Sequence, residues 1–289
     1  MSRYDENSVN KGIGIKARRV IAYTVLIFFS ILCLIWFYFL LINATRSRGE
    51  LTTGFTPLPS THFFDNMYAV LVKGSLPWIL GLINSLIIAL LSAVFATYFS
   101  SMTAYAIHAY DFKIKKFMFT FILMVMTIPT QVTALGFVQM IDKMGMDDTF
   151  IPLIVPSVAS PVVFFYMKQY MESTLPLSLV EAARMDGSGE FRTFNTIVLP
   201  LMKPAIAVQA IFTFVGSWNN YFTPALVLHS NHKKTLPILI ATLRGADFMK
   251  FDMGHVYFSI AFSIFPVVIV YLLLSKFIVQ GVALGGVKG

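Results

Sequence analysis

The residues that could carry chemistry in this chain are sparse, and their most regular spacing lies between residues 181 and 200. That stretch reads EAARMDGSGEFRTFNTIVLP, and it mixes the acidic Glu181, Asp186 and Glu190 with the basic Arg184 and Arg192. Helices that lie on lipid usually gather Lys and Arg on the polar face, so balanced charge favours a protein partner. We interpret this stretch as a docking segment.

The same stretch predicts two short helices joined by a glycine turn. Ser178 and Glu181 have the spacing of an S-x-x-E capping box, so we expect a helix to start there. Gly187 and Gly189 should end it, and a second helix should run from about residue 190 to 198, before Leu199-Pro200. The first helix is expected to present a small apolar face made of Leu179, Ala182, Ala183 and Met185.

Catalytic and metal-binding patterns are absent from the sequence. The histidines form no H-E-x-x-H pair, and there is no G-x-x-x-x-G-K-[ST] loop for a nucleotide. His229 and His232 could share a metal, but a solvated loop explains them better. The single cysteine, Cys33, lies in an apolar run without an intrachain partner. We predict no catalytic residue, no metal and no cofactor on this chain.

Composition places the chain in a membrane. Of its 289 residues 57% are hydrophobic and only 12% are charged, against about 25% charged in soluble domains. The mean hydropathy is +0.74. The net charge of +8 comes from basic residues scattered between apolar runs, which indicates membrane topology rather than nucleic-acid binding.

Apolar runs long enough to cross a hydrocarbon core of about 30 Å predict an all-α, polytopic bundle of six transmembrane helices in one domain, residues 1–289. The first run exceeds a signal-peptide core and lacks a cleavage site, so we expect a retained anchor. Basic residues favour the side of the N-terminus, which places both termini and the loop 172–203 in the cytoplasm. The expected spans are 20–42, 77–107, 117–140, 150–171, 204–228 and 256–279.

Helix breakers and polar residues at membrane depth indicate a bundle around a path. Prolines such as Pro129 and Pro224 free backbone groups that lipid cannot satisfy, although any one of them could merely shape packing. Asn84 favours an interhelical hydrogen bond. An aromatic face beside amides suits a polyhydroxylated solute, although Trp218 could equally be an interfacial anchor. The candidate path residues are Gln131, Trp218, Asn219, Asn220 and Tyr221.

The docking segment resembles the EAA motif of permease subunits of bacterial ABC importers. Glu181-Ala182-Ala183, Gly187, Ile197 and Leu199-Pro200 match its spacing, and Asp186 before the glycine is also typical. Elsewhere, Trp218-Asn219 and the glycine-rich end of the chain are similar to the six-span, maltose-type subunit of binding-protein-dependent sugar permeases. Gly286 departs from the usual Ala.

This resemblance implies a coupling helix between spans four and five that docks on a separate ATPase. It would assign coupling to Glu181, Ala182, Ala183, Asp186, Gly187, Leu199 and Pro200. The cytoplasmic tail, 280–289, would contact the ATPase through Gly285, Gly286 and Lys288. Implied partners are a second permease subunit in a heterodimer, two ATPases that bind ATP and Mg²⁺, an extracellular or periplasmic sugar-binding protein and the lipid bilayer, but no nucleic acid.

The resemblance therefore implies a multi-pass subunit of the bacterial cytoplasmic (inner) membrane that moves a sugar, such as an oligosaccharide or glycoside, by alternating access. A secondary active transporter of a small polar solute is the alternative. It should use acids within the membrane or an inverted repeat, whereas the acidic residues here lie outside the spans or at their ends. An intramembrane enzyme would need a nucleophile and base or a metal site.

Overall fold

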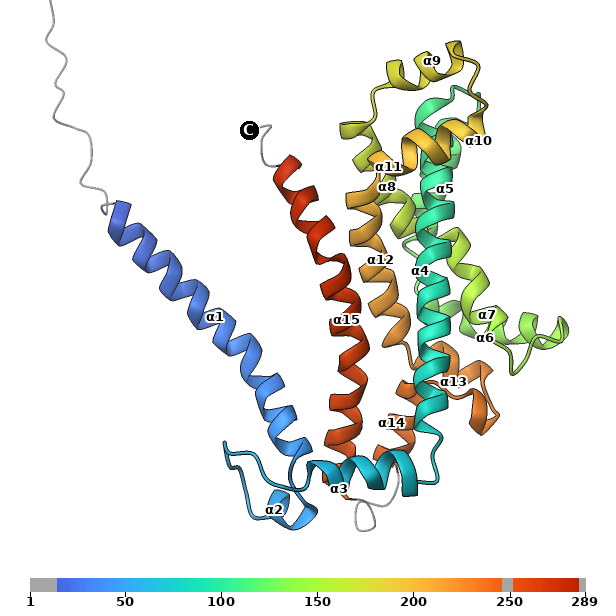
Figure 1. The fold of residues 1–289 in the computed structure, drawn as a ribbon. Coiled ribbons are helices and arrows are strands. Elements are labelled where there is room, and N and C mark those ends of the chain that lie inside the picture. Colours follow the sequence, from blue (N-terminus) through green and yellow to red (C-terminus); the bar gives the residue numbers. More distant parts are fainter. Residues whose placement is uncertain (1–14, 246–251, 286–289) are drawn as a thin grey trace, which may run out of the picture. The chain divides into compact units, whose positions relative to one another are not determined.

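The computed structural model describes residues 15–245 and 252–285, and every regular element in these ranges is a helix (Figure 1). The chain groups into two compact units. The first unit contains α1 (Ile15–Ala44), α2 (Arg48–Thr52), nearly all of α3 (Phe63–Tyr68) and residues 252–261, where α15 (Met253–Gly285) begins. The second contains the intervening elements and the rest of α15.

In the first unit, a buried arginine organises the segment that follows α1. The Arg46 side chain is 5% exposed, and its Nη2 donates to the carbonyl oxygens of Glu50 (2.6 Å) and Gly54 (3.1 Å). Ser47 and Glu50 form a capping box at the start of α2. Gly254, near the start of α15, packs directly against the backbone of Arg46. A Cβ at this position would collide with the Arg46 carbonyl oxygen. Local hydrogen bonds therefore give this polar segment a defined fold.

The second unit is built around the long helix α4. Its remaining elements are η2 (Ala69–Lys73), α4 (Trp78–Ala109), α5 (Lys115–Val125), α6 (Thr130–Lys143), α7 (Ile151–Ile154), η3 (Val155–Ala159), α8 (Pro161–Thr174), α9 (Leu177–Met185), α10 (Glu190–Thr193), η4 (Phe194–Val198), α11 (Leu199–Leu201), α12 (Lys203–Trp218), α13 (Phe222–Val227), η5 (Asn231–Lys233) and α14 (Leu236–Gly245).

Small side chains let α4 pack closely against its two main neighbours, α8 and α12. Membrane helices associate through such surfaces because small residues let the backbones approach. Phe164, Met167 and Met171 on α8 fill the space beside this surface and are fully or almost fully buried. The small residues buried on α4 include Ala89, Ser92, Ala93, Ala96, Thr97, Ser100, Ser101 and Ala104.

By length and composition, four described helices could cross a membrane, or up to six if two bent pairs each count as one span. The four are Lys16–Ala44, Trp78–Ala109, Ile151–Thr174 and Met253–Lys276. They correspond to the expected spans 20–42, 77–107, 150–171 and 256–279. The chain is thus an all-α, polytopic membrane bundle.

The two other expected spans are interrupted. The expected span 117–140 is split into α5 and α6, which meet at 97°. Pro129 takes the N-cap position of α6 with an extended ψ of 131°. Its ring nitrogen has no proton to extend the hydrogen-bond ladder of the preceding helix. The expected span 204–228 ends early, because α12 stops at Trp218 and α13 begins only at Phe222. Both breaks lie beside the cavity described below.

Candidate functional site

The polar segment between α8 and α12 folds into two helical parts joined by a turn, as the sequence predicted. Figure 1 shows α9 and α10 at one end of α4 and α12, opposite the end near α13 and α14. The predicted capping box at Ser178 is wrong, because α9 already begins at Leu177. Pro176 takes the N-cap position, and no side-chain hydrogen bond caps the helix. The fixed φ of proline suits a helix start without such a bond.

The apolar face of α9 also differs from the predicted one. Val180 and Ala183 are buried, and Val180 joins the core cluster that includes Met171 and Leu175. Leu179 and Met185 are exposed, Met185 to 88%. Val180 and Ala183 are three positions apart and therefore lie on the same side of the helix, which is the side that packs on the core. The side chains of Glu181, Ala182 and Asp186 consequently stay exposed together with Gly187.

The turn after α9 is a glycine-dependent helix ending. Gly187 has φ +77°, a conformation that other residues adopt at a cost. The Gly187 amide donates to the Arg184 carbonyl at 3.0 Å, and the Ser188 amide donates to the Ala183 carbonyl at 2.9 Å. This pair of bonds is the Schellman motif. The space where a Cβ of Gly187 would lie is open for 4 Å within this chain, so the outer surface of the turn is free to meet another protein.

Glu190 ties the two helical parts to each other and to α4. Its Oε1 accepts from Arg184 Nε at 2.7 Å, across the turn, and its Oε2 accepts from the Tyr105 hydroxyl of α4 at 3.0 Å. The Arg184 guanidinium lies over the Tyr110 ring, 5.1 Å from its centroid. Hydrogen bonds from Arg184 and then Tyr110 hold the pKa of the Glu190 carboxyl below its usual range. We call these four residues the Glu190 cluster.

The second helical part packs on the same region of α4. Phe194 is buried, and its ring centroid lies 5.7 Å from those of Tyr98 and Tyr105. Asn195 accepts from the Tyr98 hydroxyl at 3.2 Å. This contact falls in the π-helical turn η4, a form that often occurs at functional sites. The whole docking segment is therefore fixed to α4 by side chains.

We had expected Leu199 and Pro200 to stop the second helical part, but they do not. The helical path continues to Leu201, because proline in the first turn of α11 needs no amide donor. The chain then bends by 81° into α12, which begins at Lys203. Leu199 is half-buried and Pro200 is exposed. Both therefore lie at the joint between the docking segment and α12.

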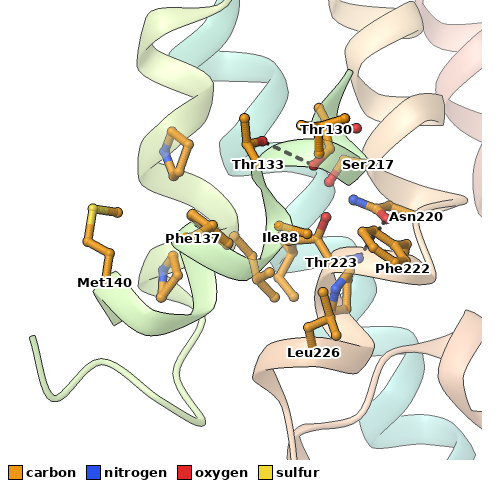
Figure 2. Close-up of a pocket in the computed structure, with 17 residues that line it drawn as sticks. Ile88, Thr130, Thr133, Phe137, Met140, Ser217, Asn220, Phe222, Thr223 and Leu226 are labelled. Carbon is orange, nitrogen blue, oxygen red and sulfur yellow. Dashed lines mark hydrogen bonds between the residues drawn. The ribbon is translucent and has the colours of Figure 1, made fainter. Parts of the chain in front are cut away.

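A cavity of about 710 Å³ lies in the other half of this unit (Figure 2). Ile88 of α4, residues of α6, the α7–η3 region, the end of α12 and α13 surround it. Its polar side chains are four hydroxyls and one amide, from Thr130, Thr133, Ser217, Thr223 and Asn220. Aromatic rings of Phe137 and Phe222 contribute to the apolar wall. A volume of this size is typical of small-molecule sites.

The structure brings one of the five candidate path residues, Asn220, to this cavity. Trp218 is 3% exposed, its ring stacks on Phe214, and its Nε1 donates to the carbonyl of Ser263 at 3.1 Å. It therefore packs α12 against α15. Gln131, Asn219 and Tyr221 are exposed outside the cavity lining. The predicted set of path residues left out the four hydroxyl residues, because isolated Thr and Ser carry little signal, although their place next to helix breakers was a clue.

A polar cluster connects the loops at the end near α13 and α14. The Asp148 carboxylate accepts from the amides of His229 and Ser230, at 2.9 and 3.1 Å, and from the Ser230 hydroxyl at 2.6 Å. Lys233 Nζ lies 3.2 Å from it. These hydrogen bonds, with the Ser230 hydroxyl first among them, hold the pKa of Asp148 well below its usual range.

Asn84 reinforces the same end of the unit. Its amide donates to the carbonyls of His232 (2.9 Å) and Lys234 (3.1 Å), and the neighbouring Ser85 accepts from the Leu236 amide at 2.9 Å. The predicted interhelical bond is therefore a bond to the loop that leads into α14. His229 lies 3.2 Å from Asp147, and no group of three potential metal ligands occurs among the described residues.

The candidate tail residues fall at the limit of the described chain. Gly285 is the last residue of α15. Gly286 and Lys288 lie outside the described residues, so their proposed contact stays a prediction.

Residues 96–284 match the family described as binding-protein-dependent transport system inner membrane component. The arabinooligosaccharides transport system permease protein AraQ of Bacillus subtilis is 35% identical over 272 residues, which cover 91% of this chain and 94% of that protein. The sn-glycerol-3-phosphate transport system permease protein UgpE of Salmonella typhimurium is 30% identical over 271 residues, which cover 91% of this chain and 95% of that protein. A bacterial ABC transporter that imports the acidic polysaccharide alginate has a similar fold, with a TM-score of 0.78 at 20% identity, covering 92% of this chain and 99% of that chain.

Proposed function

The chain belongs to the family of binding-protein-dependent transport system inner membrane components, and we propose that its cargo is an oligosaccharide or a related glycoside. It is a multi-pass inner-membrane permease subunit of an ABC importer and not itself an enzyme. Such an importer works with ATPase and binding-protein partners. The name of the relative AraQ, which covers nearly the whole chain, supports the proposed class of cargo.

The observation that carries the coupling role is the shape of the docking segment. The side chains of Glu181, Ala182 and Asp186 and the Gly187 turn are exposed, while Val180 and Ala183 hold α9 on the core. The exposed set would enter a cleft of an ATPase, with Glu181 paired to a basic residue there. Leu199 and Pro200 would transmit the resulting movement to α12.

The remaining partners follow from the same proposal. A second permease subunit would form a heterodimer with this chain, and two ATPase subunits would bind ATP and Mg²⁺. Both termini would lie in the cytoplasm, with six spans in a single transmembrane domain and Gly285, Gly286 and Lys288 near the ATPases. A sugar-loaded binding protein would dock on the opposite side.

The cavity of Figure 2 supports a path through this subunit. Asn220 would line its enclosed part, and Gln131, Asn219 and Tyr221 would line the approach to it, since they are exposed close to the two helix breaks. Trp218 would fix the wall of the path through its bond to Ser263 rather than touch the cargo.

Uptake by the reconstituted importer tests the proposed function. We expect proteoliposomes that contain this chain with its permease partner, ATPases and binding protein to accumulate a neutral sugar, such as arabinotriose, lactose or raffinose, only with ATP. Gly187→Arg should leave the chain inserted beside its permease partner but abolish ATP-driven uptake, because the side chain would project from the turn into the ATPase. Gly187→Asn is the matched control, since Asn tolerates positive φ; it should retain more uptake. Wild-type uptake by correctly inserted Gly187→Arg would contradict the coupling role.

A further inference from the structure

The cavity lies where two helix breaks approach each other. Thr130 is the first residue of α6, directly after the break that contains Pro129, and Asn220 lies in the break between α12 and α13. Irregular backbone at membrane depth is tolerated only where protein or a water-filled cavity satisfies it. The same cavity borders both breaks, which indicates a compartment that belongs to the fold rather than a packing defect.

The polar groups of the cavity can both donate and accept hydrogen bonds. Thr133 donates its hydroxyl proton to the carbonyl of Thr130 at 3.0 Å, so its oxygen is left as an acceptor. The backbone amide of Thr223 donates to Asn220 Oδ1 at 3.3 Å (Figure 2). This bond uses the oxygen of the Asn220 side chain and does not use the two N–H donors of its Nδ2. A sugar hydroxyl is itself both a donor and an acceptor, so it can use both kinds of group.

The lining residues of the cavity include no acidic, basic or histidine side chain. Taking a phosphate or carboxylate from water into such surroundings without a cation is strongly unfavourable. A neutral sugar has no such cost, and its C–H faces can pack on the rings of Phe137 and Phe222. The uncharged lining thus favours neutral sugars over phosphorylated or carboxylated sugars of similar size.

We infer that this cavity is a subsite for an uncharged saccharide, held by Thr133 and Asn220 and packed against Phe137 and Phe222, and that it selects against phosphorylated and uronate sugars. The inference rests on the proposed import of a sugar. It adds that this subunit itself contacts the cargo and contributes to the choice of it.

Cysteine protection tests the subsite directly. The single native cysteine, Cys33, allows a Cys33→Ser background that carries either Thr133→Cys or Leu135→Cys. Leu135 is the matched control, because it lies on the same helix, is 72% exposed and is outside the cavity lining. The complete importer is labelled with a water-soluble maleimide during ATP-driven turnover, with whichever of arabinotriose, lactose or raffinose the wild type imports.

We expect the imported neutral sugar to slow labelling of Thr133→Cys by about fivefold or more and to leave Leu135→Cys unchanged. An equal concentration of sn-glycerol 3-phosphate should protect neither. Normal uptake without protection at Thr133→Cys would overturn the inference. It would mean that the paired permease makes the cargo contacts or that lipid fills the cavity. Equal protection by the phosphate would overturn the selectivity. Failure of the wild type to import any neutral sugar would instead contradict the proposed function.

An isosteric variant supplies the second measurement. Thr133→Val removes only the hydroxyl and should lower the uptake rate roughly fivefold, as expected for one lost hydrogen bond. Thr103→Val is the matched control, because the Thr103 hydroxyl also donates to its own helix, at 2.9 Å to Phe99, but lies outside the cavity lining. Equal uptake by the two variants would contradict a cargo contact at Thr133.

Discussion

At the scale of single residues, Glu190 has the most connected position in the docking segment. It accepts from Arg184 across the Gly187 turn and from Tyr105 on α4, so a force applied to α9 reaches α4 through its carboxylate. A residue that transmits force should change the link between ATP hydrolysis and uptake more than it changes assembly. Glu190 is therefore a positioning residue for coupling.

We expect Glu190→Gln to lower the amount of sugar imported per ATP hydrolysed roughly three- to tenfold, the range typical of residues that modulate coupling. Glutamine preserves size but loses the ion pair with Arg184. The measurement is uptake and ATPase activity on the same proteoliposomes. Glu172→Gln is the matched control, because Glu172 forms an ion pair with Lys168 on α8 but has no bond to α4. Equal transport stoichiometry in both variants would show that the Glu190 cluster only stabilises the fold.

At the scale of elements, the sequence predicted long uninterrupted helices well and interrupted ones poorly. α4 and α15 follow from their apolar length alone. Pro129 revealed a helix breaker, but not the 97° bend, because the angle depends on what packs beyond the break. The Glu190 cluster joins residues separated by 85 positions, and a single sequence carries no signal for such a pair.

The loops near α14 form an element whose stability should depend on pH. The pKa of Asp148 is lowered in the folded state, so its carboxylate stabilises the fold above the unfolded pKa of about 3.9, and this contribution is lost as the pH falls through the folded pKa. We expect Asp148→Asn to lower the melting temperature of the purified importer by roughly 2–4 °C at pH 7, with a smaller difference from wild type under acidic conditions.

Asparagine keeps the preference for positive φ, which matters because Asp148 has φ +53°. The variant therefore tests the charge and not the backbone. Asp65→Asn is a suitable control, since that carboxylate is exposed and pairs with the nearby His62. A constant difference in melting temperature between Asp148→Asn and wild type from pH 7 down to the acid limit of the assay would show that the charge of Asp148 does not stabilise these loops.

At the scale of the whole molecule, much of the apolar surface needs partners. Within the second unit, the apolar helix α5 has no buried residue. Lipid can cover part of this surface, and a second permease subunit can cover the rest. The exposed docking face of α9 and the absence of a nucleotide-binding loop from the sequence add a need for an ATPase.

Gentle detergent extraction followed by affinity capture of this chain tests that need. In the proposed assembly, ATP hydrolysis would act on α4 and α12 through the docking segment, so we expect a second multi-span permease and a Walker-containing ATPase to be retained in fixed proportion. Gly187→Arg should keep the permease and lose much of the ATPase, since its added side chain changes only the docking turn. Recovery of this chain alone, under conditions that keep a known importer intact, would contradict the assembly and favour a transporter that works without ATP.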